Sequence, residues 1–296
     1  MNNKSSASAV PLRSDNRTLL QKFAAAPHIV WSALFIIIPL LFVAFYAFTE
    51  TVETDGVKQM VFTFGNVSEF FTKKYLLIFW RSVKLALIAT AVCLLIGYPA
   101  AYFISKASPK VQKMCIMLIM IPMWMNFLIR TYAWMVLLMD KGIINQALEG
   151  VGLSPIHIIG TETAVVIGMV YDFLPYMIMP IYSIMTKRDH RLVEAAQDLG
   201  CNSFNVFRKV ILPQSIPGVI SGITMVFVPS ISTFYISQKL GYGKFLLIGD
   251  AIETQFLANN LHMAAALSLV LMIILLVGMF IIDRFSDSSE GGGLMP

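Results

Sequence analysis

Charged residues are scarce in this chain. Asp, Glu, Lys and Arg account for 13% of its 296 residues, whereas hydrophobic residues account for 57%. An average soluble domain carries about 25% charged residues, so the composition excludes a typical soluble globular protein and indicates a membrane protein. The net charge of +5 is explained by lysines and arginines on cytoplasmic loops, and nucleic-acid binding is not predicted.

Cysteine and the common catalytic motifs are rare or missing. Cys93, Cys115 and Cys201 lie singly, so neither a disulfide framework nor a zinc site is indicated. The sequence contains no G-x-x-x-x-G-K-[ST], H-E-x-x-H or G-x-S-x-G motif, and residues 241–245 (GYGKF) lack the hydroxyl residue of the first one. We therefore predict a protein that is not an enzyme, does not hydrolyse ATP itself and carries no metal or cofactor.

Long apolar runs are what the sequence has in abundance. A helix needs about 20 apolar residues to cross the hydrocarbon core of a bilayer. Runs of that length occupy residues 29–48, 83–104, 114–139, 164–185, 216–236 and 264–282. The first run exceeds the apolar part of a signal peptide and has no cleavage site after it. These runs predict an all-α membrane protein whose transmembrane domain, residues 27–285, contains six helices.

The distribution of lysine and arginine predicts the orientation of these helices. With the N-terminus inside, cytoplasmic segments carry 13 of these residues and external loops carry 7. Because positive residues accumulate on cytoplasmic loops, both termini are predicted to lie in the cytoplasm. Residues 1–26 then form a polar cytoplasmic tail, and the glycine-rich residues 286–296 are predicted to be disordered.

The longest polar segment between two apolar runs is the loop at residues 187–215, which the topology places in the cytoplasm. Its pattern predicts two short helices, with Asp189 and Ser203 as N-caps, Gly200 as the corner and Pro213 as the stop. Two adjacent alanines on the first helix would let a partner surface approach closely. An amphipathic helix resting on the membrane is the alternative interpretation. The residues that define the pattern are Glu194, Ala195, Ala196, Gly200, Val210, Leu212 and Pro213.

This spacing resembles the signature loop of ABC importer permeases, which reads E-A-A, three residues, G, nine residues, I, one residue, L-P. Val210 stands where the family usually has Ile, and both side chains are β-branched and apolar. Shorter tags along the chain resemble the permease B subunits of bacterial spermidine/putrescine importers, which are binding-protein-dependent inner-membrane components. These tags are residues 97–99 (GYP), 128–132 (LIRTY), 179–182 (MPIY), 234–235 (FY) and 247–249 (LIG), together with Pro175.

The resemblance implies a fold, a location and a set of partners. The fold is the type I ABC importer transmembrane bundle in a bacterial inner membrane, surrounded by lipid. The partners are a second homologous permease, two ATP-binding cassette subunits that hold ATP and Mg, and an extracytoplasmic substrate-binding protein. The expected substrate is a polyamine. The implied mechanism is alternating access, in which closure of the ATP-binding subunits moves the signature loop and the helices joined to it.

Two ionisable residues within the predicted spans are candidates for the translocation path. Charges in a membrane are costly and indicate a functional site. Arg130 and Asp172 lie at similar depth, so the two side chains could meet, and a structural ion pair is the alternative role. Tyr176, one helical turn from Asp172, and Phe234 and Tyr235 are the aromatic candidates.

Because these candidates include charges of both signs, two other functions stay open. One is an ABC permease for another solute, such as an inorganic anion or ferric ion. The other is a membrane subunit that only docks a partner and transports nothing.

Overall fold

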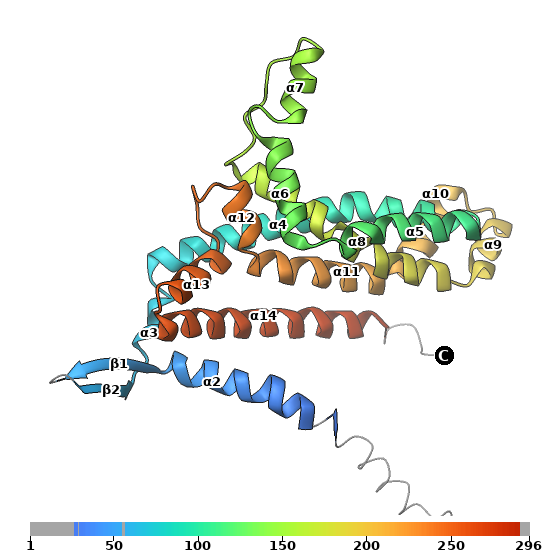
Figure 1. Cartoon of the computed structure of the whole chain (residues 1–296). Helices are drawn as coiled ribbons and strands as arrows, with labels where there is room; N and C mark the ends of the chain where they lie inside the picture. The colour runs from blue at the N-terminus through green and yellow to red at the C-terminus, as the bar shows by residue number, and fades with distance from the viewer. Residues whose placement is uncertain (1–26, 29, 55–56, 291–296) are drawn as a thin grey trace, which may run out of the picture.

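Three long helices form the centre of the computed structural model, which describes residues 27–28, 30–54 and 57–290. They are α4 (Lys73–Lys106), α8 (Glu162–Lys187) and α11 (Leu212–Ser232), and they run side by side (Figure 1). Buried side chains such as Cys93, Met177 and Val226 fill the space between them. A Cβ atom on Gly222 would lie 2.8 Å from the sulfur of Met177, so this glycine permits the close approach of α11 and α8.

The remaining long helices pack beside this centre. Helix α14 (Leu261–Glu290) lies along α11, and α2 (Ile38–Ala47) packs against α14 (Figure 1). Helix α2 continues a short π-helical segment, η1 (Ala33–Ile37). Among the described residues, five helices are long and apolar enough to span a membrane, and a bent pair would make a sixth. The chain therefore has the mostly helical, multi-span architecture that the hydropathy predicts.

The prediction of one continuous helix at residues 114–139 was wrong. Helix α5 (Pro109–Trp124) and helix α6 (Phe127–Leu138) meet at a bend, and the segment Pro109–Trp124 differs in direction by 93° from the segment Phe127–Gly150. Pro122 lacks an N–H for the helix, and the Asn126 side chain accepts a hydrogen bond from the Leu128 N–H at 2.8 Å. A proline near the end of one helix and a cap for the next separate the two.

Two further boundaries differ from prediction. The run at 216–236 is interrupted, because α11 ends at Ser232 and the short α12 (Tyr235–Leu240) follows. Helix α14 extends to Glu290, into the segment predicted to be disordered, because no Pro occurs between residues 261 and 290 and the run of three glycines begins only at residue 291. The predicted N-terminal tail, residues 1–26, and residues 291–296 lie outside the described part of the chain.

The bundle has two dissimilar ends (Figure 1). One carries α9 (His190–Asp198) and α10 (Ser203–Val206), and we call it the α9 end. The opposite end, which we call the α12 end, carries α12 and α13 (Ile248–Leu257) with the short α3 (Gly65–Glu69). It also carries an antiparallel hairpin of β1 (Thr49–Thr54) and β2 (Val57–Phe62). From α6, helix α7 (Ile143–Gly150) projects away from the bundle.

Candidate functional site

The first half of the signature loop folds as its sequence pattern predicts. The carboxylate of Asp189 accepts a hydrogen bond from the Arg191 N–H at 3.0 Å and so caps α9. Gly200 ends the turn after α9 with φ +81°, in the left-handed region that glycine tolerates. No atom lies within 4 Å of a Cβ built on Gly200, so the backbone conformation alone requires glycine here.

The second half of the loop differs from prediction in two places. Asn202, rather than Ser203, caps the next helix, since its side-chain oxygen accepts from the Asn205 N–H at 2.8 Å. Pro213 does not stop the helix. The chain passes through the π-helical segment η2 (Phe207–Ile211), and Pro213 is the second residue of α11. A π-helical turn removes the need for the backbone N–H that proline lacks, so the helix continues.

Helix α9 presents an uncovered surface to its surroundings. Glu194 and Ala195 are exposed, and Ala196 is half-buried. Large apolar side chains are exposed beside them, with 85% of Leu199 and 67% of Phe204 accessible. Large exposed apolar side chains are a feature of protein interaction surfaces. The α9 end thus offers apolar side chains that nothing within the described chain covers.

Phe207 connects the signature loop to the central helices. Its ring meets the rings of Tyr98 and Tyr102 on α4 edge-on, with centroids 6.0 and 5.5 Å apart. The Tyr98 hydroxyl and the Ser215 hydroxyl share a hydrogen bond of 2.9 Å, which joins α4 to α11. A displacement of the loop would therefore act directly on α4 and α11. Val210 is half-buried, and Leu212 and Pro213 are exposed at the start of α11.

Arg130 and Asp172 meet in the interior of the bundle. The Arg130 Nη1 lies 3.3 Å from the Asp172 Oδ1, and the two side chains are only 9% and 3% exposed. The guanidinium comes from the first turns of α6 and the carboxylate from the middle of α8. Tyr176 does not join them, because its side chain is 40% exposed and its ring packs near Phe173. The sequence correctly places the pair at one depth, but the tyrosine faces elsewhere.

An aromatic cluster lies next to this pair at the α12 end. The ring of Tyr235 lies 6.4 Å from the ring of Tyr132 and 6.0 Å from that of Phe127. The Arg130 guanidinium lies 5.9 Å from the Phe127 ring, so the ion pair and the cluster adjoin. The Lys239 ammonium sits over both tyrosines, 5.3 Å from the Tyr132 ring and 5.5 Å from the Tyr235 ring.

Sequence reasoning found Tyr235 but missed Lys239, Tyr132 and Phe127. The four-residue separation of Tyr235 and Lys239 was the available signal, because residues so spaced share a helix face. No such signal marks Phe127 and Tyr132, because their place in the cluster depends on how α6 packs against α12.

Phe234 faces a different site from its neighbour Tyr235. It lines a cavity of about 480 Å³ between α2, α13 and α14, together with Tyr46, Phe256 and Glu253. The Gln238 amide donates a short hydrogen bond to Glu253. Glu253 is thus an acid close to Phe234, and it was not among the predicted site residues.

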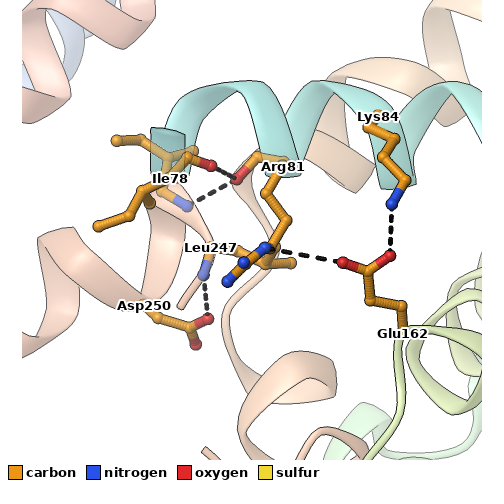
Figure 2. Close-up of polar contacts among 8 residues, drawn as sticks. Ile78, Arg81, Lys84, Glu162, Leu247 and Asp250 are labelled. Carbon is orange, nitrogen blue, oxygen red and sulfur yellow. Dashed lines mark hydrogen bonds and ion pairs between the residues drawn. The ribbon is translucent and has the colours of Figure 1, made fainter. Parts of the chain in front are cut away.

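Polar contacts fix the elements of the α12 end. Figure 2 shows Arg81 and Lys84 of α4 pointing at Glu162 of α8, with distances of 3.6 and 2.6 Å. It also shows the Asp250 carboxylate accepting from the Leu247 N–H at 2.8 Å.

The same carboxylate also binds an element outside its own helix. Asp250 accepts from the Ser237 hydroxyl at 2.9 Å and so joins α13 to α12. Burial raises the pKa of Asp250 to about 6, against the lowering effect of these two hydrogen bonds.

Comparison with known proteins places the chain among transport permeases. Residues 93–290 match the family described as binding-protein-dependent transport system inner membrane component. A relative from Haemophilus influenzae, named spermidine/putrescine transport system permease protein PotB, is 40% identical over 89% of this chain and 93% of its own length. The protein of that name from Escherichia coli is 39% identical over 83% of this chain and 90% of its own.

Solved structures share the fold at low sequence identity. A permease chain of a bacterial alginate ABC transporter, in complex with its pentasaccharide-bound periplasmic protein, superposes with a TM-score of 0.70 at 16% identity. That match covers 92% of this chain and 95% of the other. A chain of the MetNI methionine ABC transporter superposes with a TM-score of 0.56 at 16% identity, over 74% of this chain and 99% of its own.

Proposed function

Because the chain belongs to the family of binding-protein-dependent transport inner membrane components, we propose that it forms a path for spermidine and putrescine with a second homologous permease. The chain is a multi-pass inner-membrane permease subunit of an ABC importer and is not itself an enzyme. The observation that carries the substrate proposal is the 40% identity, over most of both chains, to a permease named for these polyamines.

The α12 end supports a cationic amine as the transported solute. An ammonium group is stabilised over the faces of aromatic rings and by carboxylates. Both kinds of group occur at this end but at separate places, the rings of Tyr132 and Tyr235 at one and Glu253, beside Phe234, at the other. Asp172 forms an ion pair with Arg130 at 3.3 Å. We therefore propose that the substrate contacts Tyr132 and Tyr235 rather than Asp172.

The α9 end supports coupling to ATP-binding subunits. Glu194, Ala195 and Ala196 lie on the outer helix α9, and Gly200 fixes the corner after it. We propose that α9 docks in a groove of the partner ATPase, which would bind ATP and Mg. Motion of α9 would then reach α4 and α11 through Phe207 and the Tyr98–Ser215 hydrogen bond.

A competition uptake assay tests the substrate. Vesicles holding the full complex and its binding protein would be offered labelled putrescine, spermidine, sulfate and ferric iron in turn, each with the other three unlabelled solutes as competitors. Competition by the two polyamines alone is the expected result. Uptake blocked by sulfate or ferric iron would identify a permease for another solute. A complex that assembles but takes up none of the four would point to a docking subunit.

A further inference from the structure

The Lys239 ammonium lies over the rings of Tyr132 and Tyr235. We propose that Lys239 is a tethered surrogate that fills the Tyr132–Tyr235 site while no substrate is present and leaves it when an alkylammonium ligand arrives. This inference rests on the proposed transport of polyamines. It assigns the two tyrosines as the ligand site and Lys239 as the residue that regulates access to it.

The contacts of Lys239 are those of a ligand held by aromatic rings. Its nitrogen lies 5.3 and 5.5 Å from the two ring centroids, within the roughly 6 Å at which a cation is attracted by a ring. Among the ion pairs of the described residues, none joins Lys239 to a carboxylate. The rings are therefore what holds the charge. A lysine side chain ends in the same primary alkylammonium group as a polyamine.

The geometry also allows the lysine to leave. Tyr132 is 45% exposed and Lys239 is half-buried, so the site opens to its surroundings. The two rings come from different helices, with Tyr132 on α6 and Tyr235 on α12. The lysine stem is a flexible four-carbon chain, whereas the backbone of α12, which carries Tyr235, is packed against α8. Ile236 and Leu240 of α12 press against Gly168 of α8, where an added Cβ would lie 2.4 Å from a Leu240 methyl group.

The exchange preserves the charge at the rings. The ligand's ammonium group binds to the rings as the Lys239 ammonium leaves them. The rings therefore hold one cation before and after the exchange. A site that is occupied in this way binds its ligand less tightly than the bare ring pair would. That weakening suits a transport site, which must release what it binds.

Replacing Lys239 by Met removes the ammonium group from the two tyrosine rings and keeps most of the aliphatic side chain. We expect the purified complex without its binding protein to bind labelled spermidine about 2- to 5-fold more tightly in Lys239→Met, the range of one exposed cation–π contact. Lys239→Arg should bind like the wild type, because a guanidinium also stacks on tyrosine. Tyr235→Leu should weaken binding, and adding Lys239→Met to Tyr235→Leu should then change little.

A charge control separates occupation of the rings from simple repulsion. Lys244 lies at the same end of the bundle, beside Gly160 rather than over the tyrosine pair. Lys244→Met removes the same charge without vacating the rings, so binding should change less than in Lys239→Met. Equal gains in the two variants would overturn the surrogate role, as would unchanged binding in Lys239→Met.

Uptake by the wild-type complex keeps the two proposals distinct. Spermidine uptake with no tighter binding in Lys239→Met rejects the surrogate and leaves the transport function standing. Absence of polyamine uptake in the wild type, with its binding protein present, rejects the function and the surrogate with it.

Discussion

The two ends of the bundle differ in the contacts that join their elements. At the α9 end the chain leaves Leu199 and Phe204 largely exposed, and its inner anchor is the packing of Phe207 on α4. At the α12 end, ion pairs and hydrogen bonds such as Arg81–Glu162 and Asp250–Ser237 join the elements within the chain. The α12 end also exposes large apolar side chains, such as Leu257 and Phe64, so what distinguishes it from the α9 end is this internal polar framework.

The roles assigned to the two ends depend on which end faces the cytoplasm, and this orientation can be measured directly. In a background without native cysteines, Ser108→Cys should be shielded from an impermeant thiol reagent in intact cells, and Ala147→Cys on the projecting α7 should label. Both positions are exposed, whereas Asn145 in the same helix is buried and would be a poor reporter. Permeabilised cells should label at both sites. Labelling of Ser108→Cys from outside would reverse the orientation and the roles assigned to the two ends.

The next largest effect is expected at Gly200. Gly200→Val forces a β-branched residue into the left-handed region at a cost of about 1–2 kcal/mol, so the corner after α9 should rearrange. We expect normal membrane insertion and a fall of about 5- to 30-fold in substrate-stimulated ATP hydrolysis, the rate equivalent of that cost. Gly200→Asn is the matched control, because Asn tolerates this conformation.

Glu194→Lys tests the surface of α9 instead of its corner, and should also uncouple hydrolysis while insertion stays intact. Full transport by a protein carrying both Glu194→Lys and Gly200→Val would remove the coupling role from this end.

How much the sequence reveals differs between the ends. At the α9 end, Asp189 and Gly200 act through their own backbone, so local pattern predicts the first helix and its corner. The local pattern gave the wrong N-cap for the next helix, because Asn202 and Ser203 are adjacent and both can cap. It also predicted a stop at Pro213, where a π-helical turn allows the helix to continue. Hydropathy indicated the spans but not the bend after Trp124, because both halves of that run are apolar.

At the α12 end the important contacts join distant parts of the chain. Tyr132 and Lys239 meet only because α6 packs on α12, and no local pattern encodes that packing. The Arg130–Asp172 contact could be anticipated because two charges at one depth of a membrane have strong reason to pair. The orientation of Tyr176 could not, since helical spacing alone does not say which face a neighbour covers.

Substitutions at Arg130 and Asp172 test whether this ion pair stabilises the bundle interior next to the α12 end. Each single change, Arg130→Met or Asp172→Asn, leaves a buried partner without its counter-charge, and we expect a loss of about 3–5 kcal/mol in stability. The double variant should recover much of that loss. Thermal unfolding and yield of the assembled complex measure both. Normal assembly of Asp172→Asn with reduced polyamine uptake would instead make Asp172 a substrate ligand.

Asp250 gives the smallest expected effect and tests the framework through pH. Burial raises its pKa in the folded protein from 3.8 to about 6. The folded state therefore binds this proton more tightly than the unfolded state. The resulting stabilisation is fully present below pH 3.8 and is lost as the pH rises through about 6. At pH 7 the charged carboxylate costs roughly 1–3 kcal/mol relative to the protonated form.

Asp250→Asn isolates this contribution because its side chain stays neutral throughout. Asn has one acceptor oxygen where Asp250 uses two, for Ser237 and Leu247, so the variant should be less stable than the wild type at pH 4 by about 1 kcal/mol. The stability difference between the variant and the wild type should shrink or reverse by pH 7.5, because only the wild type then carries a buried charge at position 250. Unfolding temperatures of the detergent-solubilised complex across this range measure the difference. Asp140→Asn, at an exposed ion pair with His157, should show a much smaller change over the same pH range. A stability difference between Asp250→Asn and the wild type that stays constant from pH 4 to 7.5 would show that Asp250 is charged throughout and that its hydrogen bonds outweigh its burial.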